Sequence, residues 1–147
     1  MKSSASPPKP TKPIWLILNR VWFLWIFYRL LAYPLLVGFS LSSMGQALMG
    51  VVWQFFVLLP ALLLTPTIKK GNSPYALIVA SLVMLVYLGA VGVFLLMRLY
   101  ENAPLPVSIG FAIETFLLLA INALLFVLLK RLPPMHKSAL QGRSNDL

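Results

Sequence analysis

The sequence predicts an all-α integral membrane protein with four transmembrane helices, arranged as two hairpins and preceded by an aromatic-rich interfacial helix. Composition, the lengths of the apolar runs and the positions of the basic residues support this prediction. Of the 147 residues, 60% are hydrophobic and 10% are charged, whereas soluble domains have about half and about a quarter. A small soluble fold cannot bury this much apolar surface, so we expect the excess to face lipid in one membrane domain.

The apolar runs have the lengths that membrane-spanning helices need. A helix rises 1.5 Å per residue, so about 20 residues cross a hydrocarbon core of about 30 Å. The predicted spans are residues 30–48, 51–67, 75–97 and 107–129, within a domain that covers residues 30–132. A tight turn between the first two spans predicts one antiparallel hairpin, and the last two spans, which an external loop connects, form the second.

The basic residues predict the orientation of the chain. With these four spans, 11 of the 12 Lys and Arg residues fall on one side of the membrane, and only Arg98 falls on the other. Such an excess in short loops and tails marks the cytoplasmic side, so both termini are expected to be cytoplasmic. The net charge of +9 lies beside apolar spans. Anionic lipid headgroups, which attract each basic residue by about 1 kcal/mol, are therefore the expected partners, and nucleic acid is not.

Two polar tails flank the predicted membrane domain. Residues 1–13 contain four prolines and three lysines and have almost nothing to bury. Such a segment is expected to be a disordered cytoplasmic tail. Residues 133–147 are also polar and are expected to form a mobile cytoplasmic tail.

Residues 14–29 are predicted to form a helix at the cytoplasmic interface, or a helical lead-in to the first span. The apolar part, Ile14 to Tyr28, is rich in Trp, which prefers the headgroup boundary, and its helix is only about 22 Å long. An alternative span, Val21 to Leu41, would place Arg29 near the bilayer centre at a cost of about 2.5–3.5 kcal/mol or more. We therefore prefer the later register, in which Arg29 lies at the cytoplasmic edge.

Glu114 is the main candidate for chemistry inside the membrane. It lies seven residues into the last predicted span, roughly 10 Å below the outer surface. An ionisable group at this depth is costly, so it points to a functional role. It can lock helices together, with Arg98 as the expected partner, or it can carry protons or recognise a cation. We favour the structural role and keep the second role open.

Other polar side chains in the spans predict hydrogen bonds between helices. Asn122 lies eight residues beyond Glu114, on an adjoining face of the same helix, and Gln54 and Tyr87 lie on two other spans. In lipid, such bonds contribute about 1 kcal/mol or less each. We therefore expect these residues mainly to hold the bundle together.

The sequence lacks the residue sets that enzymes and metal sites need. It has no cysteine and one histidine, His136, in the C-terminal tail. Paired carboxylates, a glycine-rich phosphate loop and a cluster of metal ligands are also missing from the sequence. We therefore expect a protein that is not an enzyme and that uses no cofactor or metal.

Residues 30–132 resemble a family of small, uncharacterised bacterial inner-membrane proteins that share a four-helix domain of unknown function. The matching features are Leu58-Leu59-Pro60 before Leu64-Thr65-Pro66, Tyr87 within a long span, and a last span that contains Glu114 and ends in Lys130-Arg131. The resemblance implies a multi-pass protein of the bacterial inner membrane. It implies no activity.

Two hypotheses for function follow. In the first, the protein is a non-enzymatic accessory or assembly subunit that docks on a larger envelope complex through its small-residue and aromatic helix faces. In the second, it is a homo-oligomeric small transporter or lipid-handling protein in which Glu114, Asn122 and Arg98 line a path. A membrane-protein partner supports the first hypothesis, and self-association supports the second.

Overall fold

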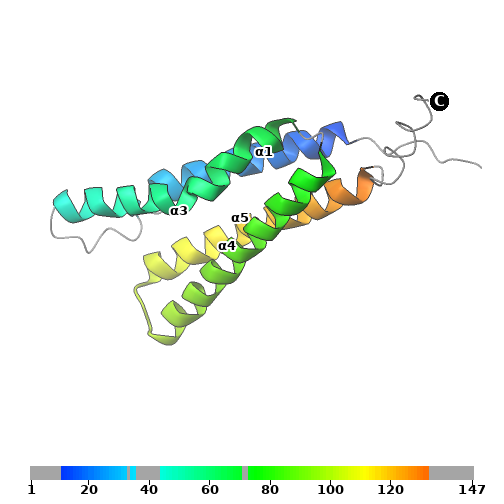
Figure 1. The fold of residues 1–147 in the computed structure, drawn as a ribbon. Coiled ribbons are helices and arrows are strands. Elements are labelled where there is room, and N and C mark those ends of the chain that lie inside the picture. The colour runs from blue at the N-terminus through cyan, green and yellow to red at the C-terminus, as the bar shows by residue number, and fades with distance from the viewer. Residues whose placement is uncertain (1–10, 33, 36–43, 71–72, 133–147) are drawn as a thin grey trace, which may run out of the picture.

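The computed structural model describes residues 11–32, 34–35, 44–70 and 73–132, and the described chain is all-α (Figure 1). The helices are α1 (Lys12–Phe27), α3 (Met44–Lys70), α4 (Pro74–Tyr100) and α5 (Leu105–Arg131). A π-helical segment, η1 (Tyr28–Ala32), directly continues α1. The expected N- and C-terminal tails fall outside the described residues, except that α1 already begins at Lys12.

The described residues form four helices that are long and apolar enough to cross a membrane. The first, Lys12–Ala32, has 21 residues, and the other three have 27 each. At 1.5 Å per residue, these helices are about 32 Å and about 40 Å long, so each can cross a hydrocarbon core of about 30 Å. The prediction of an all-α, multi-span chain is confirmed.

The structure differs from the sequence-based expectation at its first span. The candidate span Lys12–Ala32 contains the segment 14–29 that was expected at the interface. The predicted span 30–48 covers the end of η1 and the start of α3, and its central residues, 36–43, lie outside the described part. The candidate span Lys12–Ala32 ends three residues after Arg29, so it does not centre on Arg29 as the Val21 to Leu41 register would, and Arg29 is buried and paired there. The other predicted spans lie within α3, α4 and α5.

The four helices pack in a ring. Helix α1 contacts α5 and α3, and α4 contacts α3 and α5. The start of α1, the junction of α3 with α4 and the end of α5 lie at the same end of the bundle (Figure 1). A hydrogen bond of 2.9 Å from Trp15 Nε1 to the Ile68 carbonyl joins α1 to the end of α3 there. This end carries Lys12, Lys69-Lys70 and Lys130-Arg131, whereas the α4–α5 loop lies at the opposite end.

Tryptophan rings form the centre of the packing between α1 and its neighbours. Trp22 and Trp25 are fully buried. The Trp25 ring meets the Tyr87 ring of α4 edge to face, with centroids 5.6 Å apart, and Trp22 Nε1 donates to Thr65 Oγ1 of α3 at 3.2 Å. These two rings are the largest fully buried side chains among the described residues, so they supply much of the contact area of α1.

The outer surface of the bundle is apolar. Phe27, Trp53 and Phe126 are 62%, 70% and 69% exposed, and many other large apolar side chains are similarly open. In water, continuous apolar patches of this extent lead to aggregation or association. On helices that cross a membrane, they are the surface that lipid tails or neighbouring helices cover.

Local signals explain where α4 begins. Ser73 is its N-cap, and its hydroxyl accepts a hydrogen bond from the Ala76 amide at 3.5 Å. Pro74 occupies the first helical position, where its missing N–H costs no intrahelical bond. The Ser-Pro pair therefore separates α3 from α4.

Candidate functional site

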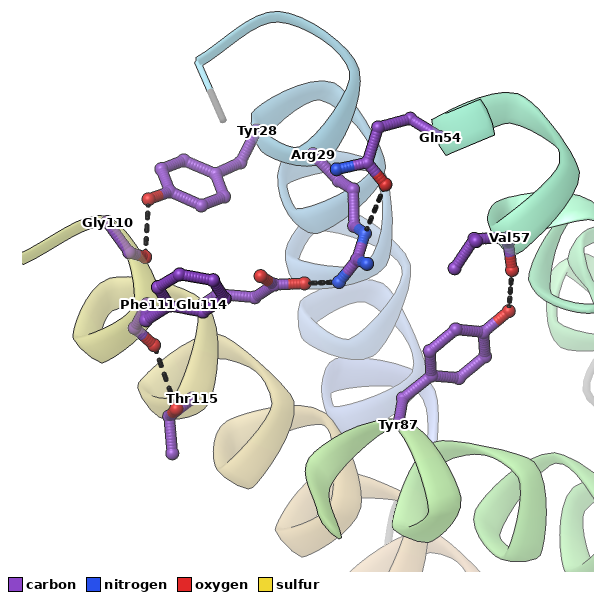
Figure 2. A network of polar contacts seen from close by, with 9 residues as sticks. All are labelled: Tyr28, Arg29, Gln54, Val57, Tyr87, Gly110, Phe111, Glu114 and Thr115. Carbon is purple, nitrogen blue, oxygen red and sulfur yellow. Dashed lines mark hydrogen bonds and ion pairs between the residues drawn. The ribbon is translucent and has the colours of Figure 1, made fainter. Parts of the chain in front are cut away.

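A buried ion pair lies at the contact between the first span and the last. Glu114 projects from α5 and is fully buried, and Arg29 projects from η1 and is 8% exposed. The Nη1 atom of Arg29 forms a salt bridge with Oε1 of Glu114 (Figure 2). The pair joins residues 85 positions apart in the sequence. It therefore fixes α5 against the first span.

Gln54 extends this pair to a third helix. The Nε atom of Arg29 donates to Oε1 of Gln54 on α3 at 3.2 Å, and Gln54 is 8% exposed. The guanidinium thus bridges a carboxylate and an amide from two different helices (Figure 2). A buried charge is tolerated where both an opposite charge and further hydrogen bonds compensate for lost hydration, and Arg29 has both.

Tyr28, the residue before Arg29, makes a second contact with α5. Its hydroxyl donates to the Gly110 carbonyl at 2.7 Å. Gly110 and Glu114 are four residues apart, so they lie one turn apart on the same face of α5. Two adjacent residues of η1 therefore hold one turn of α5. Both lie in a π-helical turn, a rare geometry that is often found at functional positions.

Tyr87 connects α4 to the rest of the bundle. Its hydroxyl donates to the Val57 carbonyl on α3 (Figure 2), and its ring packs against Trp25 of α1. Gln54 and Tyr87, both expected from the sequence to bond between helices, do so in the structure. With the Arg29 contacts, these bonds link all four helices around one buried region.

The structure does not bring Arg98 to Glu114. Arg98 instead forms an exposed ion pair of 3.4 Å with Glu101, three residues away. The expected Arg98–Glu114 pairing was wrong because Arg98 lies near the end of α4, close to the loop, while Glu114 faces the first span. The partner of Glu114 in the structure is Arg29, which the sequence-based prediction places at the cytoplasmic edge of the first span.

Asn122 is likewise not part of the network. Its Nδ2 atom donates to the Leu118 carbonyl of its own helix at 2.9 Å. Eight residues of helix separate it from Glu114, a rise of about 12 Å. The two side chains therefore do not form the single groove that the sequence suggested.

One oxygen of the buried carboxylate remains available for another contact. Oε2 of Glu114 is buried and has no hydrogen-bond partner among the described residues. A carboxylate oxygen can accept up to two hydrogen bonds. The Oε2 atom is therefore the acceptor of this network at which a further hydrogen-bond donor or a proton could bind. Over the described ranges, no group of three or more His, Cys, Asp or Glu residues could hold a metal ion.

Arg29 and Tyr28 are the site residues that the sequence analysis missed. A signal existed, because Arg29 interrupts an apolar run and Glu114 interrupts another. An acid and a base inside membrane spans are expected to pair with one another. The sequence-based prediction places Arg29 at the cytoplasmic edge without a partner, and therefore it does not include this pair.

Comparisons with protein-family models, with curated proteins and with solved structures found no match to this chain. The four long apolar helices indicate a small multi-pass membrane protein. The resemblance to small bacterial inner-membrane proteins stays a prediction.

Proposed function

We propose that this protein is a non-enzymatic accessory or assembly subunit of a membrane-embedded complex. The observation that carries the proposal is the use of its interior polar groups. Arg29, Gln54 and Glu114 contact one another, and Tyr28 and Tyr87 donate to backbone carbonyls of neighbouring helices. These bonds hold the four helices in one arrangement.

The burial of Glu114 and its salt bridge to Arg29 favour a structural role for this residue over a transport role. A residue that binds and releases a proton or a cation needs access to water at some stage. Glu114 is fully buried and carries a salt bridge to Arg29. Breaking a buried pair of this kind costs about 3–5 kcal/mol, which a transport cycle would have to supply in each turnover.

The apolar outer surface supports docking on another membrane protein. On α3, the aromatic side chains Trp53 and Phe56 lie three residues apart on one face, and they are 70% and 62% exposed. Flat aromatic rings give large contact area at low cost in conformational entropy, and they are enriched in interfaces. A transmembrane helix of a partner is the occupant that we propose for this face.

The proposed location is a bacterial inner membrane, with both termini cytoplasmic. The end of the bundle that carries Lys12, Lys69-Lys70 and Lys130-Arg131 supports this orientation, because basic residues gather on the cytoplasmic side. Among the described residues at the opposite end, the one cation is Arg98, in the last turn of α4, and it is paired with Glu101 in the α4–α5 loop.

Site-specific photocrosslinking in intact membranes tests the proposal. A photoreactive residue at Phe56 of α3, in a tagged copy at native expression level, is expected to capture one defined heterologous membrane protein. The matched control is position 116 of α5, because Phe116 is 72% exposed on another helix. Capture from position 56 but not from position 116 supports the proposal. Self-crosslinks alone, or equal labelling from both positions, would contradict it.

A homo-oligomeric small transporter or lipid-handling protein is the second candidate function. The observation in its favour is the buried Oε2 atom of Glu114, which has no partner among the described residues and could receive a proton. Proton flux into liposomes that contain the purified protein tests it. Flux that Glu114→Gln abolishes would support this candidate, and unchanged flux in that variant would eliminate it.

A further inference from the structure

A charged side chain lies on the outer face of the first candidate span. Arg20 is exposed and lies eight residues after Lys12, which corresponds to about 12 Å along the helix. None of the described residues forms a hydrogen bond or an ion pair with it. An arginine that faces lipid is costly unless its guanidinium reaches water or an anionic group.

An apolar groove extends along the helix from Arg20. It is open and shallow, and its lining includes Arg20, Phe23, Leu24, Phe27 and Leu31. The spacing of three or four residues places these side chains on one face of α1 and η1. The groove thus combines one cationic position with a long apolar surface.

A second cation lies near the same position. The Nζ atom of Lys69, at the end of α3, is 5.9 Å from the centroid of the Phe23 ring. Phe23 is therefore in contact range of a cation from the neighbouring helix, and it also lines the groove. Arg20 and Lys69 flank the Phe23 end of the groove from two different helices.

Both cations lie toward the basic end of the bundle, for different reasons. Side chains on a helix lean toward its N-terminus, so Arg20 leans toward the end of the bundle where α1 begins. Lys69 belongs to the last turn of α3, which ends there. Long basic side chains near span ends extend in this way to the headgroup region. The apolar part of the groove then lies deeper, at the level of the acyl chains.

We propose that Arg20 and Lys69 bind the phosphate of an anionic phospholipid, and that one of its acyl chains lies in the groove along Phe23, Leu24, Phe27 and Leu31. The site needs a ligand with a negative group at one end and a long apolar part beyond it. A guanidinium matches the geometry of a phosphate through paired N–H donors. The site depends on the chain spanning a membrane, and it stands whether or not the protein is an accessory subunit.

Native mass spectrometry of the full, delipidated chain tests the site. The probes are phosphatidylglycerol and phosphatidylcholine with the same acyl chains, which differ in net charge. The wild-type protein is expected to bind phosphatidylglycerol preferentially. The variants Arg20→Gln and Lys69→Gln are each expected to weaken its binding about tenfold, because each loses a charge-assisted hydrogen bond to the phosphate.

Matched variants separate this site from general charge attraction. Arg20→Lys keeps the charge and is expected to keep most of the preference. Lys70→Gln removes the neighbouring cation, and Arg98→Gln removes the cation near the opposite end. Neither side chain lines the groove or lies over Phe23, so each variant is expected to change binding less than about twofold. Leu24→Trp fills the groove and is expected to weaken binding of both lipids. Melting in phosphatidylcholine nanodiscs is expected to be unchanged for Arg20→Gln, because Arg20 is exposed.

Three results would overturn the proposal. The first is equal binding of the two lipids by the wild-type protein. The second is a loss for Lys70→Gln as large as the loss for Arg20→Gln. The third is a change in oligomeric state for Arg20→Gln with unchanged lipid binding, which would show that Arg20 pairs with an acidic group of a second copy.

Discussion

Removing the charge of Arg29 is expected to destabilise the bundle far more than removing both charges of its ion pair. In Arg29→Met, the fully buried Glu114 loses its salt bridge, and Gln54 loses the donor at 3.2 Å. A buried charge left without its partner costs about 3–5 kcal/mol. A lost hydrogen bond between membrane helices adds about 0.6 kcal/mol. The total loss in the free energy of unfolding is therefore expected to be about 4–6 kcal/mol.

The double variant Arg29→Met/Glu114→Leu removes both charges and leaves an apolar contact of similar size. Replacing a buried ion pair by apolar side chains is often neutral or stabilising. The double variant is therefore expected to unfold within about 1 kcal/mol of the wild-type protein, although Glu114→Leu alone also costs about 3–5 kcal/mol. The assay is SDS titration in mixed micelles, with unfolding followed by tryptophan fluorescence.

The exposed Arg98–Glu101 pair provides the matched control. Its side chains are 48% and 53% exposed, and exposed pairs contribute about 0–1 kcal/mol, so Arg98→Met is expected to have little effect. Additive losses in the double variant of Arg29 and Glu114 would refute the reasoning, because they would show that neither charge depends on the other.

Three further predictions concern the contacts around this pair and the orientation. Tyr28→Phe removes the 2.7 Å bond to the Gly110 carbonyl and is expected to lower the free energy of unfolding by about 0.6–1.7 kcal/mol in the same titration; no loss would show that the bond contributes nothing. Trp25→Ala empties a fully buried position and is expected to cost about 3–5 kcal/mol, whereas Trp53→Ala, at a 70% exposed position, should change stability by less than about 0.5 kcal/mol. A reporter that is active only in the periplasm should be active when fused after Asn102 and silent when fused after Lys70, and the reverse pattern would refute the proposed orientation.

Three of the four helices could be predicted from the sequence because their apolar runs are long and end at charged or proline-rich turns. The predicted spans 51–67, 75–97 and 107–129 all lie within helices of the structure. Each helix extends beyond its predicted span, because hydropathy marks the hydrocarbon-spanning part and not the helix ends. The interhelical roles of Gln54 and Tyr87 followed from a general rule, that polar groups within spans bond to neighbouring helices.

Hydropathy alone did not predict the ion pair, because hydropathy does not say which helices are neighbours; the signal was the two opposite charges within apolar runs. Arg29 and Glu114 are 85 residues apart, and their contact depends on α1 packing against α5. The first span was misplaced for another reason. Residues 14–29 are rich in Trp and form only a short helix by themselves, which favoured an interfacial position, whereas the helical run in the structure extends from Lys12 to Ala32.

The pairing of the first span with the last has a consequence for biosynthesis. Arg29 leaves the ribosome 85 residues before Glu114, and at about 5–20 residues per second this interval lasts about 4–17 s. During that time, the least apolar of the four candidate spans must enter the membrane without its counter-charge. A chain truncated before α5 would keep Arg29 without Glu114 permanently. The ion pair of the first helix can therefore form only after α5 has been synthesised.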